Sequence, residues 1–404
     1  MNSVTSILDA PLPPRLVRPL IASLERIAVG TLRLETPEGY ELRFGDGGEP
    51  QADLQLKQWS ALRHIFRYGD IGLAECYRDG LVKTSDLTQL IRLGIRNQTV
   101  LERAIHGNPL LGLGSRLRHL LRRNSRRGSA RNIQAHYDLG NEFYRLWLDP
   151  SMTYSSACFD DRRGADLMQA QQVKYRRMLD LVGARPGDSI LEIGCGWGGF
   201  AEYAASEGIR VHGVTLSHEQ LAYARERIQQ AGLQELACFE LRDYRDLQGR
   251  YDHIVSIEML EAVGEAYWAG YFRRIHELLR PGGRAALQSI VIDESHFARY
   301  RRSTDFIQQY IFPGGMLPSP ARIVEQAQAQ GLRVERIDSF GADYAETLRR
   351  WRWRFDANRE AVLGLGFDST FIRLWRFYLA YCEAGFEEGR IDLLQVGLEK
   401  GAAR

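Results

Sequence analysis

The feature that most constrains the fold is a glycine-rich turn after an apolar stretch near the middle of the chain. The stretch "SILEIG" predicts a strand, and Gly194, Gly196, Gly198 and Gly199 crowd the run "LEIGCGWGGF" at 191–200. Glycine permits a sharp turn and a close approach of the backbone to a bulky ligand. In an α/β sheet, ligands bind beyond the carboxyl ends of the strands. The run therefore predicts a ligand-binding turn between a strand and a helix.

Beyond this turn, short apolar runs alternate with helical patterns. Strands are predicted at 189–194, 210–216, 251–257 and 284–292, and helices at 201–206, 218–231 and 267–279. Such alternation is typical of a parallel sheet with helices on both faces. The predicted fold class is therefore α/β, with a doubly wound, Rossmann-like sheet.

The first hundred residues predict a smaller α+β unit. "GTLRL" and "GYELRF" alternate apolar and polar positions around "ETPE", which predicts a hairpin, and "ADLQLK" predicts a third strand. Helical patterns follow at 58–66 and 85–95, the second with a helix start at Ser85 and Asp86. A chain of 404 residues favours two domains. We expect a binding or docking unit at 1–110, a linker at 111–131 and a catalytic unit at 132–404.

The linker carries an uneven share of the positive charge. The formal net charge is only +2, yet no acidic residue occurs from Arg103 to Tyr137, and seven arginines lie between Arg116 and Arg131. One interpretation is a solvated linker. The other is a cationic patch for an anionic membrane surface. Because no zinc-ligand pattern or aromatic-rich binding motif accompanies the arginines, nucleic acid is not expected as a partner.

Cysteine use and hydropathy predict the compartment. The five cysteines lack CxxC spacing, which favours reduced thiols in the cytoplasm. The first residues do not resemble a secretory signal, and no segment supplies the roughly 20 apolar residues that span a bilayer. We expect a cytoplasmic protein that binds peripherally to the inner face of the cell membrane.

Two cofactors compete for the glycine-rich turn. Gly194, Gly196 and Gly199 match G-x-G-x-x-G, but a dinucleotide site also needs an acidic residue about 20 positions later, and Thr215 lies there. S-adenosylmethionine fits better. Glu192 at the strand end suits its positive amino-acid end, and Asp243 in "RDYRDL", after the fourth strand of the pattern, suits its adenine.

Eight motifs in order then resemble one family. They are "HYDLGNEFYRLWLDPSMTYSSACF", "LEIGCGWGGFAEYAA", "VTLSHEQLAYA", "DYRDL", "SIEMLEAVG", "YIFPGGMLPS", "FGADYAETLRRW" and "YCEAGF". From Asn132 onward the chain resembles the cyclopropane-fatty-acyl-phospholipid synthases and related lipid methyltransferases. The N-terminal unit is more loosely similar to that family's lipid-binding domain. The resemblance implies a class I methyltransferase domain with a helical lid, which transfers a methyl group from S-adenosylmethionine to the double bond of an unsaturated phospholipid acyl chain.

The resemblance also implies a base for the carbocation that methyl transfer leaves. Family members hold a bicarbonate ion there, and the matching residues are Glu261, Tyr344 and Cys382. Two positions depart from the family pattern, because Ser156 replaces a cysteine and Gln288 replaces a histidine. Glutamine donates a hydrogen bond but does not titrate near neutral pH. The resemblance implies cyclopropane formation, and the departure at Gln288 makes a methylene- or methyl-branched chain the alternative.

Cofactor contacts, too, follow from the resemblance. Matching the motifs assigns the methionine end of the cofactor to Tyr154 and Ser155, and the turn beneath it to Gly194 and Gly196. The ribose is assigned to Thr215 and Gln220, and the adenine to Asp243. No metal is expected, since sulfonium transfer needs none. "DFIQQYIFPGG" predicts a lid over an acyl pocket, and aromatic side chains at Phe143, Trp147, Tyr154 and Phe159 are candidates for its wall.

Other functions and partners remain open from the sequence. A methyltransferase for a small soluble acceptor, a nicotinamide oxidoreductase and a lipid-binding protein with a decayed active site are the rival functions. A second copy of the chain is a candidate partner.

Overall fold

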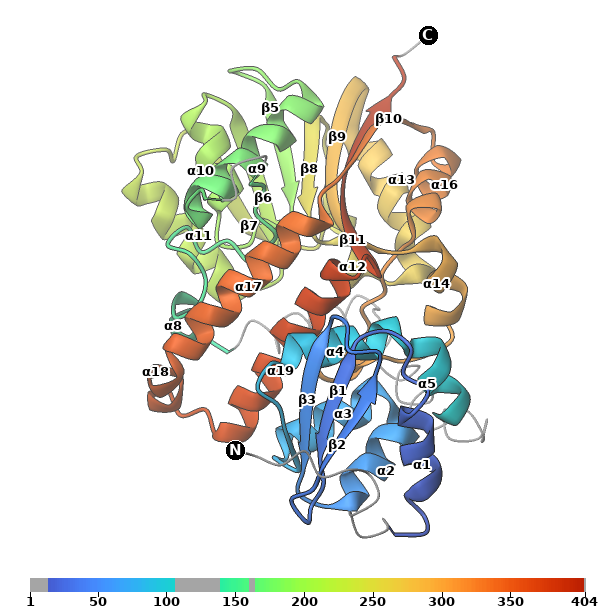
Figure 1. Cartoon of the computed structure of the whole chain (residues 1–404). Helices are drawn as coiled ribbons and strands as arrows, with labels where there is room; N and C mark the ends of the chain where they lie inside the picture. Colours follow the sequence, from blue (N-terminus) through green and yellow to red (C-terminus); the bar gives the residue numbers. More distant parts are fainter. Residues whose placement is uncertain (1–13, 106–138, 160–163, 403–404) are drawn as a thin grey trace.

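The computed structural model describes residues 14–105, 139–159 and 164–402. In this part of the chain the strands form a four-stranded sheet in the order β2-β1-β3-β4 and a seven-stranded sheet in the order β10-β11-β9-β8-β5-β6-β7 (Figure 1). We call residues 14–105 the N-terminal unit and residues 139–402 the C-terminal unit. The proposed boundary at 110 and the basic linker at 111–131 lie outside the described residues and stay predictions.

The small sheet confirms the predicted hairpin. Its strands are β1 (Thr31–Glu35), β2 (Glu41–Gly45), β3 (Gln51–Leu56) and β4 (Val82–Lys83). β1 and β2 pair antiparallel, and β3 joins β1 in parallel. Alternate side chains of these strands, including Leu34 and Leu42, are buried, as the period of the sequence predicts.

The described part of the N-terminal unit also has α1 (Arg18–Leu24), α2 (Trp59–Tyr68), α3 (Asp70–Arg78), α4 (Leu87–Arg96) and α5 (Gln98–Ile105). Of these, α2, α3 and α4 contact the strands of the small sheet. α4 begins at the predicted position, because the Asp86 side chain accepts a hydrogen bond of 3.1 Å from the backbone N–H of Gln89. The α+β character of the N-terminal unit is therefore present as predicted.

The large sheet agrees with the predicted α/β fold and adds strands that the sequence did not reveal. Its strands are β5 (Ser189–Ile193), β6 (Arg210–Thr215), β7 (Ala237–Leu241), β8 (Tyr251–Ile257), β9 (Leu279–Ile292), β10 (Leu332–Ser339) and β11 (Ile391–Lys400). The first five are parallel, whereas β10 and β11 run antiparallel to their neighbours. Asp243 therefore follows β7, the third strand of this unit along the chain, and the prediction of a fourth strand there is wrong.

Helices cover both faces of the large sheet, as the doubly wound fold requires. Those that contact its strands are α9 (Leu167–Val182), α10 (Gly199–Ser206), α11 (His218–Gln230), α12 (Leu260–Val263), α13 (Trp268–Leu278) and α16 (Pro320–Ala329). This part of the chain also has α8 (Asn141–Arg145), α14 (Glu294–Tyr300) and α15 (Phe306–Tyr310). Neighbouring side chains of β5 point to opposite faces, because Leu191 packs in one apolar cluster with α13 and Ile190 packs in another with α9 to α11.

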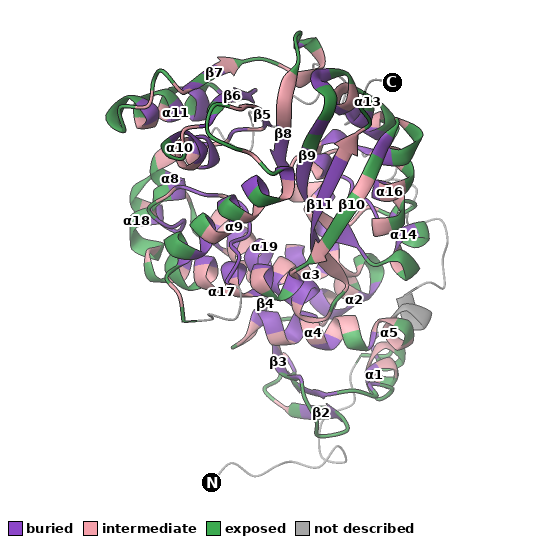
Figure 2. Ribbon diagram, turned by 90° about the horizontal axis from the view of Figure 1, so that it is seen from above, coloured by how far each residue is buried: buried purple, intermediate pink, exposed green. Residues whose placement is uncertain are grey.

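Between β10 and β11 the chain forms α17 (Gly341–Ala357), α18 (Arg359–Gly364) and α19 (Ser369–Glu387), and α19 packs against α3 and α4 of the N-terminal unit. Figure 1 shows α17 and α19 crossing between the two sheets, and α19 is mostly buried in Figure 2. Glu383 of α19 is 2% exposed and accepts hydrogen bonds from Arg352 Nε at 2.8 Å and from Thr88 Oγ1 at 3.3 Å. A buried carboxylate thus ties α17, α19 and α4 together.

We predict that Glu383→Ala destabilises the folded protein by about 3 kcal/mol, because Arg352 then keeps a poorly solvated charge without its partner. Chemical denaturation followed by circular dichroism measures the change. Glu360→Ala, at an exposed position of α18, is the control and should change stability by less than about 0.5 kcal/mol. Equal effects of the two substitutions would show that the buried contact does not support the junction.

Candidate active site

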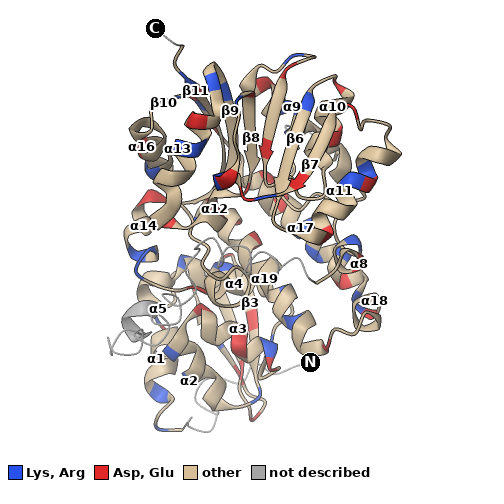
Figure 3. Cartoon of the chain, turned by 180° about the vertical axis from the view of Figure 1, so that it is seen from behind, with Lys and Arg blue, Asp and Glu red and all other residues tan. Residues whose placement is uncertain are grey.

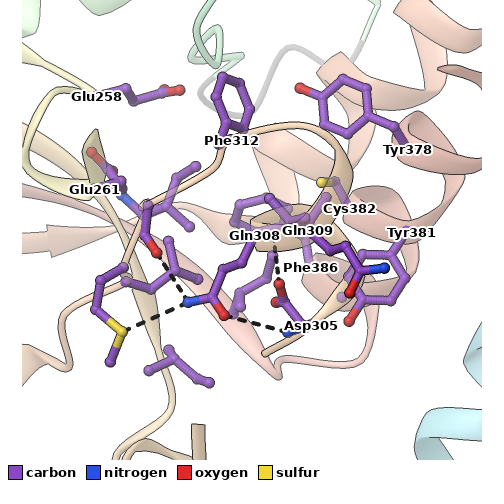
Figure 4. A pocket seen from close by; sticks show the side chains of 18 of the residues that line it. Glu258, Glu261, Asp305, Gln308, Gln309, Phe312, Tyr378, Tyr381, Cys382 and Phe386 are labelled. Carbon is purple, nitrogen blue, oxygen red and sulfur yellow. Dashed lines mark hydrogen bonds between the residues drawn. The ribbon is translucent and has the colours of Figure 1, made fainter. Parts of the chain in front are cut away.

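A cavity of about 1300 Å³ lies at the carboxyl ends of the parallel strands and continues into the N-terminal unit. Its walls include the turns after β5, β6 and β8, the segment around α15, one side of α19, and apolar side chains of the N-terminal unit such as Leu62 and Leu90. Figure 4 shows Glu258 and Glu261 on one side of this cavity, Tyr378 and Cys382 on the helix opposite, and Phe312 between them. The position agrees with the ligand site of an open α/β sheet.

The glycine-rich turn and Glu192 form one end of the cavity. Glu192 is 3% exposed, its Oε2 has no hydrogen-bond partner among the described residues, and burial raises the pKa of its carboxyl group. Gly196 has φ +52°, and no atom lies within 4 Å of the position that a Cβ would take there. An unpartnered buried carboxylate beside an open backbone turn fits the positive amino-acid end of S-adenosylmethionine.

The turn also needs glycine at its start. Gly194 has φ +83°, and a Cβ there would lie 2.3 Å from Sδ of Met259. Both the left-handed backbone and the close side chain exclude a larger residue.

The residues predicted for the ribose and adenine all line the cavity. The Thr215 hydroxyl donates to Oε1 of Gln220 at 2.8 Å, which fixes both side chains at the end of β6. The Asp243 carboxylate lies 2.5 Å from Nη2 of Arg245. The structure brings these three residues together as the sequence predicts, and their cofactor roles stay predictions.

The segment predicted for the methionine end is held by α9. Tyr154 and Ser155 line the cavity, and the Tyr154 hydroxyl lies 2.7 Å from the hydroxyl of Tyr378. Ser155 Oγ accepts from Nζ of Lys174 at 2.6 Å, and its carbonyl accepts from Nε2 of Gln171 at 2.9 Å. Two side chains one turn apart on α9 therefore fix the backbone that leads to Ser156.

Lys174 was not predicted from the sequence. Its side chain is fully buried, and burial lowers its pKa to about 7, while the carboxylates of Glu258, Asp149 and Glu192 act in the opposite direction. The sequence does contain a signal for a buried lysine, because Lys174 falls at a position that the helical spacing of α9 places on its buried face. A lysine on such a face is costly unless charged groups surround it.

Glu258 is the most important residue that the sequence did not reveal. Its Oε1 accepts from the backbone N–H of Ser156 and from Nε2 of Gln288, both at 2.9 Å, and its Oε2 accepts from the Tyr344 hydroxyl at 2.6 Å. The sequence predicts that Ser156, Gln288 and Tyr344 surround bicarbonate. In the structure these three donors bind the Glu258 carboxylate instead, so a side chain supplies the negative charge there.

The backbone of Glu258 is strained. Its φ is +53°, and its N–H donates to the carbonyl of Gln288 at 2.7 Å. A left-handed conformation in a residue other than glycine costs about 1 kcal/mol or more and is concentrated at functional sites. Gln288 is itself oriented by Nε2 of Gln395, which donates to its Oε1 at 2.9 Å. Burial raises the pKa of the Glu258 carboxyl group.

Glu261 and Cys382 line the same cavity. The Glu261 Oε1 accepts from the backbone N–H of Ile290, and its Oε2 has no hydrogen-bond partner among the described residues. Burial and the nearby Glu258 raise the pKa of Glu261 to about 8. Burial also raises the pKa of the Cys382 thiol, which is therefore neutral at physiological pH.

The predicted aromatic wall is only partly correct. Tyr154 lines the cavity, whereas Phe143, Trp147 and Phe159 do not and are buried in the apolar core. In the lid, Phe306 packs its ring 4.8 Å from that of Phe377, while the neighbouring Ile307 and Phe312 line the cavity. Core filling and pocket lining have the same sequence pattern, so a dense aromatic segment does not distinguish them.

Known proteins resemble this chain over most of its length. A match to the family described as mycolic acid cyclopropane synthetase covers residues 124–396. The tuberculostearic acid methyltransferase UfaA1 of Mycobacterium tuberculosis is 39% identical over 393 residues, 93% of this chain and 92% of that protein. The cyclopropane-fatty-acyl-phospholipid synthase of Escherichia coli is 34% identical over 360 residues, 88% of this chain and 89% of that protein.

A solved structure supports the cofactor. The mycolic acid cyclopropane synthase CmaA1, in complex with SAH and CTAB, is 32% identical, has a TM-score of 0.63 and covers 67% of this chain and 98% of its own. SAH is the demethylated form of S-adenosylmethionine, so the fit of Glu192 and the glycine turn agrees with this comparison.

The pKa of Glu261 predicts a pH effect on stability. Because the folded state raises this pKa from 4.5 to about 8, folding binds a proton and the folded state loses stability as the pH rises through that interval. The lowered pKa of Lys174 acts in the opposite direction above about pH 7, so pH 5 to 7 is the informative window.

We therefore predict that the melting temperature of Glu261→Gln falls less between pH 5 and 7 than that of the wild type. Differential scanning fluorimetry measures both slopes. Glu360→Gln, at an exposed site, should keep the wild-type slope. Parallel slopes for all three proteins would contradict a buried, proton-binding Glu261.

Proposed function

The chain belongs to the mycolic acid cyclopropane synthetase family of S-adenosylmethionine-dependent lipid methyltransferases, and we propose that it methylates the double bond of an unsaturated acyl chain with Glu258 as the base. The observation that carries this proposal is the binding of the Glu258 carboxylate by Ser156, Gln288 and Tyr344. These donors otherwise match the bicarbonate site that the resemblance implies.

The cofactor end of the cavity provides a buried negative charge and the groups that would position the cofactor. S-adenosylmethionine, when bound, supplies an electrophilic methyl group. Glu192 would hold its amino group, Ser155 would lie at its methionine end, and Gly196 leaves the space that its backbone approach needs. Lys174 keeps Ser155 in place and balances the two buried carboxylates of Glu192 and Glu258.

The acyl end of the cavity is apolar and aromatic. Ile307 and Phe312 on the lid and Tyr378 on α19 line it, with the rings of Phe312 and Tyr378 6.2 Å apart. An alkene is a weak nucleophile, so a dry and positioned site favours its attack. Aromatic faces also stabilise positive charge, which develops on the acyl chain when the methyl group is added.

Glu258 then completes the reaction. Addition of a methyl group to one alkene carbon leaves a cation at the other carbon, and loss of one proton from the chain restores neutrality. The Glu258 carboxylate accepts that proton and becomes a carboxylic acid, which solvent later deprotonates. Burial raises its pKa, and a raised pKa makes a carboxylate a better general base.

We propose that the product is an open chain with a methylene branch. Ring closure, the reaction expected from the resemblance, depends there on bicarbonate and a histidine, and here Glu258 and Gln288 take those places. A hydride shift towards the cation, followed by loss of a proton from the added methyl group to Glu258, gives the branch. The similarity to a tuberculostearic acid methyltransferase over 93% of the chain supports a product other than a cyclopropane.

The substrate is proposed to be a membrane lipid. Among the described residues, no helix has the length and hydropathy of a membrane span. The proposed attachment is peripheral, at the inner face of the cell membrane, and the arginines between Arg116 and Arg131 would attract anionic headgroups. The rival with a small soluble acceptor does not explain an apolar cavity that continues into the N-terminal unit.

The direct test incubates the protein with S-adenosylmethionine that carries a labelled methyl group and with vesicles of unsaturated phospholipid. We expect a labelled acyl chain that is heavier by one methylene unit and that takes up hydrogen on mild hydrogenation. A product that resists hydrogenation would identify a cyclopropane instead. No labelled lipid at all would contradict the proposed function.

In the same assay, Glu258→Gln should lower turnover by a factor on the order of 10²–10⁴, because the amide cannot accept the proton. The affinity for S-adenosylmethionine, measured by calorimetry, should stay close to that of the wild type. Glu219→Gln, at an exposed position on α11, is the control and should keep full activity. Turnover of Glu258→Gln near the wild-type rate would show that another group is the base.

Lys174 has a distinct prediction. The Lys174 ammonium favours the ionised form of Glu258, so removal of the lysine charge should raise the Glu258 pKa. The acidic limb of the pH–kcat profile of Lys174→Met should move to higher pH by about 1 unit. Lys174→Arg should restore the limb, and the exposed Lys57→Met should leave it unchanged. An unmoved limb in a folded Lys174→Met protein would contradict this electrostatic role.

A further inference from the structure

The Gln288 side chain is oriented by two residues that do not line the cavity. Gln288 of β9 and Gln395 of β11 lie opposite each other in the antiparallel pair, and both side chains are buried. Nε2 of Gln395 donates to Oε1 of Gln288 at 2.9 Å, and Oε1 of Gln395 accepts from Nε of Arg177 at 3.3 Å. Nε2 of Gln288 in turn donates to Oε1 of Glu258 at 2.9 Å. We call Gln395 and Gln288 the amide bridge, because they connect Arg177 on α9 to the carboxylate.

The two ends of the amide bridge permit only one orientation of the amides between them. A guanidinium group only donates hydrogen bonds, and an ionised carboxylate only accepts them. Gln395 therefore directs its oxygen towards Arg177, and its NH₂ group is left for the oxygen of Gln288. The NH₂ group of Gln288 is then directed to Glu258. Each amide passes the same polarity to the next, so the donor end of Gln288 faces the carboxylate.

Arg177 is itself held at the edge of the large sheet. Its Nη2 lies 3.5 Å from Oδ2 of Asp338 on β10, and its guanidinium group lies over the Phe340 ring, 4.9 Å from the ring centroid. Figure 3 shows basic and acidic residues together at this edge, where β10 has both signs of charge. The Arg177 side chain keeps 29% of its surface exposed. A charge is costly to bury, so the structure keeps the guanidinium group partly solvated and extends only neutral, hydrogen-bonded amides into the interior.

The same helix also holds a second donor to the carboxylate. Gln171, Lys174 and Arg177 lie three residues apart on α9, so their side chains project from one side of the helix. Gln171 and Lys174 bind Ser155, and they thereby hold the backbone that leads to the donor N–H of Ser156. One side of α9 therefore supports two of the three donors, one through the backbone and one through the amide bridge.

We propose that Arg177 and Gln395 are positioning residues of the reaction, because they keep the donor end of Gln288 against the carboxylate. This inference rests on the proposed function, in which Glu258 is the base. A reversed Gln288 amide would place its oxygen there, would repel the ionised form and would accept a hydrogen bond from the protonated form. Protonated Glu258 would then be favoured, and a carboxylic acid cannot accept the proton that the reaction releases.

Other groups that act on Glu258 stay unchanged in the test. Burial raises the pKa of its carboxyl group, and Tyr344 of α17, Lys174 of α9 and Gln288 act in the opposite direction. Burial and the nearby Glu258 raise the pKa of Glu261 on α12. Because none of these residues is replaced below, a change in the titration of Glu258 would come from the outer part of the amide bridge.

The test breaks the connection at two points. Gln395→Met keeps the length of the side chain and removes its donor and acceptor, and it should move the titration of Glu258 to higher pH by about 1 unit. Arg177→Met should move it in the same direction by less, because Gln395 stays in place. Infrared difference spectra between each protein and its Glu258→Gln counterpart measure this titration without substrate. The double variant should show the shift of Gln395→Met alone, since Arg177 acts through Gln395.

Controls and turnover separate positioning from a general structural effect. Arg176 is exposed beside Arg177 on α9, so Arg176→Met changes the net charge equally and should leave the titration in place. Arg177→Lys, which also has only donors, should titrate as the wild type does. On the acidic limb, Gln395→Met should lower kcat about tenfold and leave the KM for the lipid unchanged. Melting curves verify that all variants fold.

Three outcomes would overturn the inference. One is a Glu258 titration that stays in place in folded Gln395→Met. Another is an additive shift in the double variant, because Arg177 would then act through space. The third is a shift in Arg176→Met as large as that in Arg177→Met, which would indicate a general effect of charge. If the titration moves as expected and the wild type transfers no methyl group to lipid, the amide bridge is supported and the proposed function fails.

Discussion

The site depends on one buried interaction, the binding of the Glu258 carboxylate by three donors from separate parts of the chain. Ser156 precedes α9, Gln288 lies in β9 and Tyr344 lies in α17. The three hydrogen bonds to the Glu258 carboxylate therefore form only when the large sheet and α17 have assembled. Burying a carboxylate is costly, and the left-handed backbone of Glu258 adds strain. The hydrogen bonds and the nearby Lys174 offset this cost. The structure thus keeps a fixed negative charge at the place where the proposed reaction would form a cation.

The second constraint is the position of α19 between the two sheets. One side of this helix lines the cavity with Tyr378 and Cys382, and the other packs on the N-terminal unit, where Glu383 binds Thr88. The N-terminal unit and the methyl-transfer end therefore line one continuous cavity. This arrangement explains why a chain of this family carries an apolar interior that reaches well beyond the methyl-transfer end.

Local patterns in the sequence predict part of the fold correctly. The glycine turn, the Asp86 cap and the parallel strands have short-range patterns, and their predicted positions are confirmed. Features that depend on contacts between distant segments, or that lack a local pattern, are absent from the prediction. The charged run "LRVERIDS" has no apolar stretch, so β10 at the sheet edge was missed. Glu258 was missed although "SIEMLEAVG" has two carboxylates three residues apart, because the donors that give Glu258 its role are distant in the chain.

The most direct measurement is turnover in buffer freed of carbon dioxide, before and after bicarbonate is added. If Glu258 is the base, wild-type turnover is the same in both conditions, whereas Glu258→Gly, which vacates the space among the three donors, is slow until bicarbonate is added. Wild-type turnover that disappears without bicarbonate and returns with it would contradict the account, because a diffusible ion rather than the side chain would then collect the proton.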